Sequence, residues 1–124
     1  MKKKKIYIIV SVCIFVCSVL SLLVAASLHY GYSEGRVLIA DDGAYFLVLD
    51  DHSPIRMTDN SQRGGLFHEL QSGDRIGVIH GGIQESYPGN TSVYYIRFLE
   101  KGTVEDIFSD VIHTLTELGW RFHK

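Results

Sequence analysis

The longest hydrophobic stretch in the chain is a nearly continuous apolar run at residues 6–28. No charged side chain interrupts it, and four lysines, Lys2 to Lys5, precede it. A helix needs roughly 20 apolar residues to cross a bilayer core, and flanking lysines stay on the cytoplasmic side. The run therefore predicts a single-pass signal-anchor or transmembrane helix within residues 1–29 of a cell-membrane protein, with residues 30–124 forming an extracytoplasmic domain.

A cleaved signal peptide is the alternative interpretation of this run. Val24, Ala25 and Ala26 resemble a signal-peptidase site, and cleavage there would release a secreted domain. The run is longer than the roughly 7–15 residues of a signal-peptide hydrophobic region, which favours an uncleaved anchor. A valine precedes both Cys13 and Cys17, so lipidation through a lipoprotein signal is not expected.

After residue 35 the pattern changes to short apolar runs separated by turn residues, and the runs at 75–80 and 91–100 alternate with a period of two. Such runs are typical of half-buried β-strands. In the last of them Tyr94, Ile96 and Phe98 share one face, which the alternation predicts to be buried. Residues 29–35 are interpreted as a polar link. Strands are predicted at residues 36–40, 44–49, 55–58, 75–80, 83–87 and 91–100.

The predicted strand at 75–80 lies at the centre of this pattern. Gly81 and Gly82 follow it directly. Because a two-residue hairpin turn requires positive φ, this pair predicts a tight reversal of the chain. Residues 59–65 are predicted to form a polar loop, and residues 66–70 a single helical turn or an irregular crossing.

The last pattern has a helical period. Thr103 or Ser109 is placed to cap its start, and Gly119 its end. We expect this stripe to pack over an open end or a face of the sheet, with Trp120 and Phe122 completing the contact. Its members recur at intervals of three and four: Val104, Ile107, Phe108, Val111, Ile112, Leu115 and Leu118.

These patterns predict a mainly β fold, namely a small OB-like β-barrel with a C-terminal helix, preceded by an N-terminal transmembrane helix. Composition agrees, since 46% hydrophobic and 21% charged residues are ordinary for a folded domain. Outside the four N-terminal lysines, eight Lys and Arg face fourteen Asp and Glu, a net charge of −6. An acidic domain repels phosphate backbones, so no nucleic-acid partner is expected.

Three motifs, at residues 70–76, 81–83 and 85–88, resemble a known family. They read Leu-Gln-Ser-Gly-Asp-Arg-Ile, Gly-Gly-Ile and Glu-Ser-Tyr-Pro. In this order they resemble small bacterial extracytoplasmic proteins with an OB-like β-barrel, many of which carry a lipoprotein signal. The resemblance implies a barrel but no particular reaction. This chain departs from it by lacking the lipoprotein cysteine and by placing its helix after the last strand, not between the third and fourth.

Aspartates in the turns are the candidate metal ligands. Hard oxygen ligands in loops suit Ca²⁺, and a meander of strands could bring these turns to one end. No Asp-x-Asp-x-Asp-Gly loop closed by a glutamate is present. Turn formation is the alternative role, because aspartate side chains bond to nearby backbone amides. The candidates are Asp41, Asp42, Asp50 and Asp51.

Catalytic candidates are few. The cysteines lie only in the apolar run, so the folded domain has no thiol nucleophile and no disulfide. His68, Glu69 and His80 would make a small hydrolase only if they converged in one cleft. No serine lies in a nucleophile elbow. We therefore predict no enzyme activity, no catalytic residue and no cofactor.

Glu85 and Tyr87 are the candidate recognition residues, since an exposed tyrosine beside a carboxylate suits a peptide or a glycan. Packing over the barrel end is the alternative role for Tyr87. The function that we predict is a non-enzymatic binding or interaction module with a protein, peptide or glycan partner, attached to the membrane through residues 6–28. The alternatives are a cation-binding domain, and a structural subunit whose helix pairs in the bilayer through Ser11, Ser18, Ser21 and Ala25.

Overall fold

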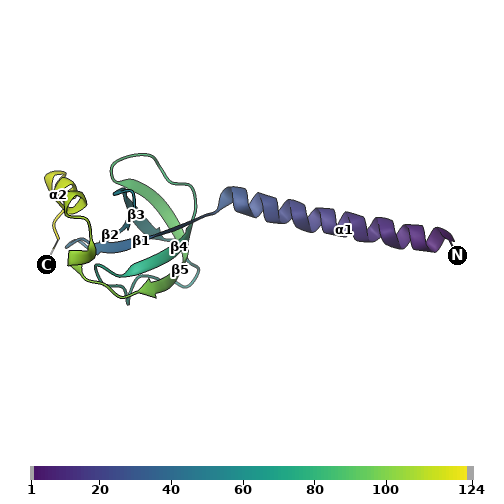
Figure 1. The fold of residues 1–124 in the computed structure, drawn as a ribbon, viewed down its shortest axis with the longest axis horizontal. Helices are drawn as coiled ribbons and strands as arrows, with labels where there is room; N and C mark the ends of the chain where they lie inside the picture. Colours follow the sequence, from purple (N-terminus) through teal and green to yellow (C-terminus); the bar gives the residue numbers. More distant parts are fainter. Residues whose placement is uncertain (1, 123–124) are drawn as a thin grey trace. The chain divides into compact units, whose positions relative to one another are not determined.

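The computed structural model describes the backbone of residues 2–122 and the side chains of residues 2–25 and 30–122. The chain divides into two compact units, the first ending at Tyr30 and the second beginning at Gly31 (Figure 1).

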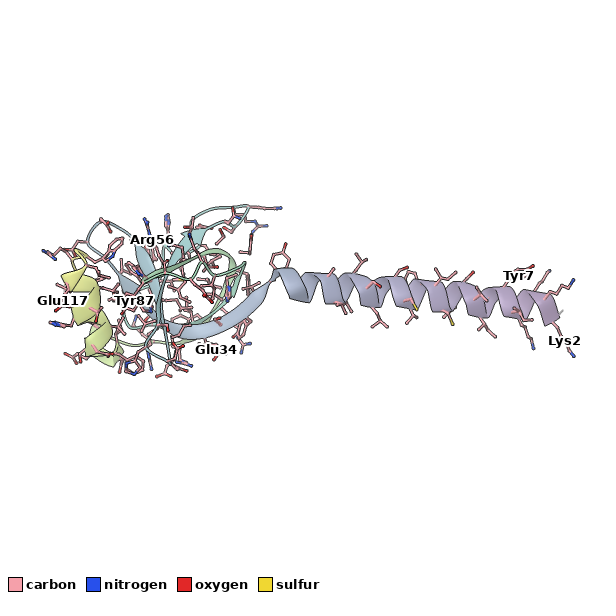
Figure 2. All side chains as sticks on the ribbon, turned by 90° about the horizontal axis from the view of Figure 1, so that it is seen from above. Lys2, Tyr7, Glu34, Arg56, Tyr87 and Glu117 are labelled. Atoms are coloured by element: carbon pink, nitrogen blue, oxygen red, sulfur yellow. The ribbon has the colours of Figure 1, made fainter. Side chains whose placement is uncertain are left out.

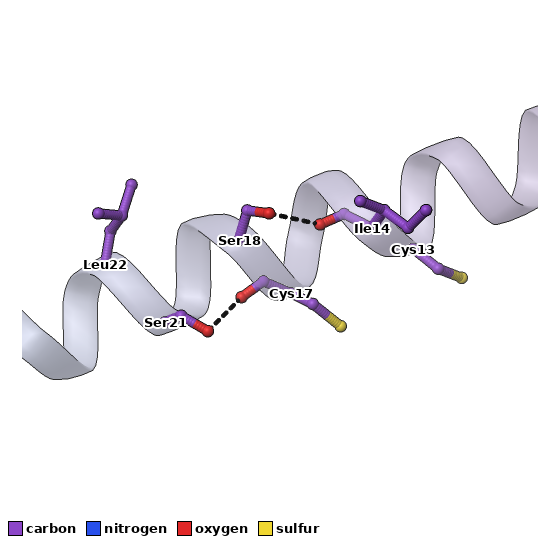
Figure 3. A pocket seen from close by; sticks show the side chains of 6 residues that line it. All are labelled: Cys13, Ile14, Cys17, Ser18, Ser21 and Leu22. Carbon is purple, nitrogen blue, oxygen red and sulfur yellow. Dashed lines mark hydrogen bonds between the residues drawn. The ribbon is translucent and has the colours of Figure 1, made fainter.

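The first unit is the helix α1 (Lys2–His29). Within its span Lys2–Ala25, an 18-residue window has a mean hydropathy of 3.0, so the helix is long and apolar enough to cross a membrane, a property that signal sequences share. Its side chains point outward on all sides (Figure 2). The hydroxyls of Ser18 and Ser21 donate to the carbonyls of Ile14 and Cys17, both at 2.9 Å (Figure 3). These bonds satisfy the hydroxyls within the helix, as an apolar environment requires.

The second unit is a closed barrel of five strands, in the order β1-β2-β3-β5-β4 (Figure 1). All neighbouring pairs are antiparallel except β3 and β5. The predicted mainly β fold is confirmed. The strands are β1 (Gly31–Ile39), β2 (Tyr45–Leu49), β3 (Pro54–Asp59), β4 (Arg75–His80) and β5 (Gly89–Glu100).

Strand β1 closes the barrel because it is long enough to pair twice. Its first half pairs with β4, from Gly31 opposite His80 to Arg36 opposite Arg75. Its second half pairs with β2. The predicted polar link at residues 29–35 is therefore wrong from Gly31 onward. Backbone hydrogen bonding to β4 makes a strand of this stretch, although its glycines, serine and glutamate have little strand propensity.

Two hydrophobic cores hold the barrel unit together. Inside the barrel, alternate residues of all five strands are buried together with Phe67 and Leu70 from the β3–β4 connection. Outside it, Phe46 and Val48 on the other face of β2 are buried beneath the C-terminal segment. Strands β1 and β2 are thus covered on both faces, which explains their continuous apolar runs.

The C-terminal segment packs on this outer face of β1 and β2. Its helix α2 (Ser109–Glu117) contributes Val111 and Leu115, both at most 1% exposed. Trp120 meets Phe46 edge-on at a centroid distance of 4.9 Å. The predicted packing on a face of the sheet is confirmed, and so is the stop at Gly119, whose φ is +107°.

The predicted single helix is divided in two. A short 3₁₀ turn, η1 (Val104–Asp106), precedes α2. Ile107 between them is extended and buried in the outer core. Phe108 stacks on the ring of His52 at 3.7 Å. Burial of Ile107 and stacking of Phe108 against the barrel override the helical period.

The predicted two-residue hairpin at Gly81 and Gly82 is wrong. Neither glycine has a positive φ, and Gly81 continues the ladder by donating to the carbonyl of Ser92 at 2.9 Å. The chain reverses later, between Gln84 and Asn90, in a segment that contains the cis peptide bond Tyr87–Pro88. The predicted strand at residues 83–87 is reduced to one bridge between Gln84 and Asn90. Thr91 supports the extended backbone by donating to both glycine carbonyls.

Candidate functional site

The second half of β5 has a neighbour on one side only. Strand β3 ends at Asp59, opposite Val93. Past Val93, β5 continues to Glu100 and pairs with β4 alone. Among the described residues, no backbone hydrogen bond joins residues 95–99 to any other segment on the open side. A sheet edge is therefore exposed along the second half of β5.

Two adjacent cavities follow this edge. One, of about 590 Å³, lies between the β3–β4 connection and the Ile96–Phe98 stretch of β5. The other, of about 580 Å³, lies between the connection and Tyr94 and Tyr95. The two share Gly65 and Leu66. We call the combined depression, between residues 61–70 and residues 94–98, the β5 groove. Both volumes are in the range of ligand sites.

The floor of the groove is hydrophobic. Leu66 and Ile96 are partly buried against the inner core, and Leu70 belongs to it. Phe98 lies opposite the inward-facing Ile76 but is 56% exposed, because no strand covers this part of the barrel. The prediction that Tyr94, Ile96 and Phe98 form a buried face is therefore wrong for Phe98, and Tyr94 is 36% exposed. A large exposed aromatic beside a cavity is typical of a binding site.

Residues 61–70 of the β3–β4 connection form one wall of the groove, and Asp59 holds this wall in place. Its carboxylate accepts hydrogen bonds from the amide and hydroxyl of Ser61, at 2.9 and 2.6 Å, and from the amide of Leu66 at 2.9 Å. These bonds, that of the Ser61 hydroxyl above all, hold the pKa of Asp59 below its ordinary value. Phe67 anchors the wall by packing its ring at 4.9 Å from that of Tyr45. Contacts within the chain thus hold the wall in place.

The two ends of the groove carry opposite charges. Arg63 lines the end beside Tyr94 and Tyr95, and Glu69 lines the end beside Phe98. Both are exposed. Among the described residues neither forms an ion pair. The groove therefore offers a cation at one end and an anion at the other.

A second exposed surface lies on the outer face of β1, β4 and β5. Tyr32, Ile79 and Tyr95 are cross-strand neighbours there and are 53%, 38% and 57% exposed. Glu34 accepts a hydrogen bond from the Tyr32 hydroxyl at 2.8 Å, and this bond is the main cause of the raised pKa of Tyr32. Tyr95 lines the groove as well, so the two surfaces meet at β5.

The predicted recognition residues lie elsewhere. Glu85 and Tyr87 are in the β4–β5 loop and line a smaller cavity of about 270 Å³ against Pro54 and Ile55 of β3. Tyr87 is 48% exposed. This cavity shares no lining residue with the β5 groove. Recognition by this pair stays a prediction.

The candidate metal ligands do not gather at one end of the barrel. Asp41 and Asp42 precede β2, whereas Asp50 and Asp51 follow it. Consecutive turns of a meander lie at opposite ends, so the predicted convergence is wrong. Among the residues that the structure describes, no three His, Cys, Asp or Glu side chains are grouped closely enough to hold a metal ion.

Three of these aspartates accept hydrogen bonds from other residues of the barrel unit. Asp42 and Asp51 accept from the backbone amides two residues further on, both at 3.0 Å. Asp50 pairs with the two terminal nitrogens of Arg75, at 3.1 and 3.2 Å. The guanidinium holds the pKa of Asp50 below its ordinary value. Turn formation and ion pairing are thus the roles that the geometry supports.

The three hydrolase candidates do not converge. His68 and Glu69 line the groove, but His80 does not. His80 is 5% exposed and bonds through its two ring nitrogens to the Ser33 hydroxyl at 2.8 Å and the Gly81 carbonyl at 2.7 Å. Buried in this way, His80 ties the start of β1 to the end of β4.

Comparison of the chain with protein-family models, curated proteins and solved structures finds no match. The resemblance to extracytoplasmic OB-like proteins therefore stays a prediction. Sequence reasoning missed the groove itself. One signal in the sequence could have indicated it. OB-like proteins have a helix between the third and fourth strands, but the β3–β4 connection of this chain is too polar and too rich in glycine to form one.

Proposed function

We propose that the chain is a membrane-tethered, extracytoplasmic binding module, with no enzyme activity, whose OB-like barrel binds its partner in the β5 groove. The observation that carries this proposal is Phe98, a 56% exposed aromatic on a regular strand beside a cavity of about 590 Å³. Exposing such a ring to water is unfavourable, and aromatic anchors in pockets dominate binding energy at interfaces.

The tether is supported by α1. The helix carries Lys2 to Lys5 at its start and no charge from there to residue 28. This asymmetry favours a cytoplasmic N-terminus and an external barrel. The structural-subunit alternative uses the same helix and would add a partner within the bilayer.

The OB-like assignment is supported by the strand order and by the parallel pairing of β3 with β5. OB-folds commonly bind ligands on the face of strands 2 and 3. In this chain the outer face of β2 is buried under α2 and Trp120, and Arg56 of β3 lies over the Trp120 ring at 5.6 Å. That face is occupied, which favours the groove as the binding site.

A binding role is favoured over catalysis by the character of the groove. Its floor is apolar, and its charged residues, Arg63 and Glu69, lie at opposite ends. The hydrogen-bonded pair Ser33 and His80 has nucleophile-and-base chemistry, but it lines neither cavity of the groove. The groove can therefore hold and orient a partner, with selectivity from its charged ends.

Site-specific photocrosslinking in intact cells tests the proposal. A benzoylphenylalanine introduced at position 98 is expected to give a discrete crosslinked product containing the full chain. Leu118, 55% exposed, is the matched control position and is expected to give none. The absence of a product at position 98, or the same products at both positions, would contradict the groove. Protease added outside the cell is expected to remove a C-terminal tag; protection of the tag would contradict the proposed topology.

A further inference from the structure

The open edge of β5 is suited to pairing with another β-strand. Alternate residues of a strand direct their N–H and C=O groups to the same side. Residues 95–99 therefore present a row of donors and acceptors toward the groove, over roughly 16 Å at about 3.3 Å per residue. A row of unpaired strand groups is a template for another strand.

The β3–β4 connection leaves room for such a strand. It stands beside the edge, but its last backbone hydrogen bond toward β5 is from Asn60 to the carbonyl of Val93, at 2.8 Å. Beyond that bond the two cavities of the groove separate the connection from β5. Asp59 and Phe67 hold the connection in this position.

We propose that the β5 groove binds an extended peptide segment of a partner protein, which adds to the edge of β5 as a further strand. This inference rests on the proposed function and names the class of its ligand. Main-chain hydrogen bonds supply affinity in this mode, and alternate side chains that enter pockets supply specificity. The side chains facing the barrel would meet the hydrophobic floor formed by Leu66, Ile96 and Phe98, which favours apolar residues at those positions.

The charged residues at the two ends of the groove determine where the peptide carries its own charges. Arg63 lies at the Tyr94 end and Glu69 at the Phe98 end. An antiparallel pair is the more stable arrangement and runs the peptide from the Phe98 end to the Tyr94 end. The peptide then carries a basic residue near its N-terminus, beside Glu69, and an acidic residue near its C-terminus, beside Arg63. Apolar residues alternate between the two.

The test uses a random heptapeptide library displayed on phage. The full chain is held in phosphatidylcholine nanodiscs, and peptides that also bind the Phe98→Ala variant in the same nanodiscs are removed. The Leu118→Ala variant is the matched control and should bind every selected peptide. The expected selection has alternating apolar residues, a basic N-terminal end and an acidic C-terminal end. A library from which no groove-dependent sequence emerges would overturn the proposal.

Backbone N-methylation of a selected peptide then tests strand pairing itself. A methyl group on the amide removes a donor and blocks the approach of β5. Methylation at every second position is expected to weaken binding by about tenfold or more, and at the intervening positions to change it little. Equal losses at all positions, or none, would overturn strand addition. The crosslink at position 98 separates the two proposals, since it would persist if only the strand pairing were wrong.

Discussion

The ring of Tyr32 lies directly against Gly77 on the neighbouring strand. A Cβ on Gly77 would collide with the Tyr32 hydroxyl oxygen. The two residues are not direct partners in the register, since Gly77 is opposite Glu34. Tyr32 thus reaches diagonally across β4 and covers a glycine that otherwise weakens the strand. The same orientation brings its hydroxyl to Glu34.

Substituting Gly77→Ala should therefore lower the pKa of Tyr32. The new methyl group displaces the tyrosine ring, whose far end is free to move, and breaks the bond to Glu34 that chiefly raises that pKa. Titration of the Tyr32 ring carbon by NMR measures the change. Glu34→Gln is the control, because it removes the carboxylate and leaves the glycine. An unchanged pKa in Gly77→Ala would show that the ring does not depend on this site.

The wall of the groove should loosen in acid. The pKa of Asp59 is lowered by the bonds it accepts, so its stabilising effect is fully present above the ordinary Asp pKa, about 3.9. The effect is lost as pH falls through the lower value of the folded state. The amide chemical shifts of Ser61 and Leu66 should follow this transition. In Asp59→Asn they should be independent of pH over the same interval, and a transition that persists there would assign it to another group.

Phe98 should contribute little to stability despite its size. With 56% of the side chain exposed, Phe98→Ala is expected to lower the free energy of unfolding by less than about 1 kcal/mol, as for most surface substitutions. Urea unfolding followed by circular dichroism measures it, with Leu118→Ala as the matched control. A loss comparable to that of a buried phenylalanine, about 3–5 kcal/mol, would mean that the ring belongs to the core.

The C-terminal segment should be part of the stable fold. Leu115 is fully buried in the outer core, so Leu115→Ala is expected to lower the free energy of unfolding by about 2–5 kcal/mol. Trp120, the single tryptophan, packs on Phe46 and reports the transition by fluorescence. Leu118→Ala, three residues further on and 55% exposed, should cost less than about 1 kcal/mol. Equal effects at the two positions would contradict the outer core.

Local patterns were sufficient for the elements of the fold. The apolar runs of α1 and β2, the period of two in β4 and the glycine stop at Gly119 depend on neighbours along the chain. Each was predicted within a few residues. The outer core was also predictable, because the C-terminal stripe needs an apolar face and Phe46 and Val48 supply one.

Long-range pairing decided the rest. The start of β1 became a strand through bonds to β4, and Gly81 stayed extended because Ser92 and Thr91 bond to its backbone. The β5 groove also depends on segments that are distant from one another in the sequence. Whether Phe98 is buried depends on where β3 ends, at Asp59, and on how far the β3–β4 connection stands from β5. Periodicity reports only which side of a strand a residue occupies. Only the tertiary structure decides whether another segment covers that side, because covering it requires residues distant in the chain.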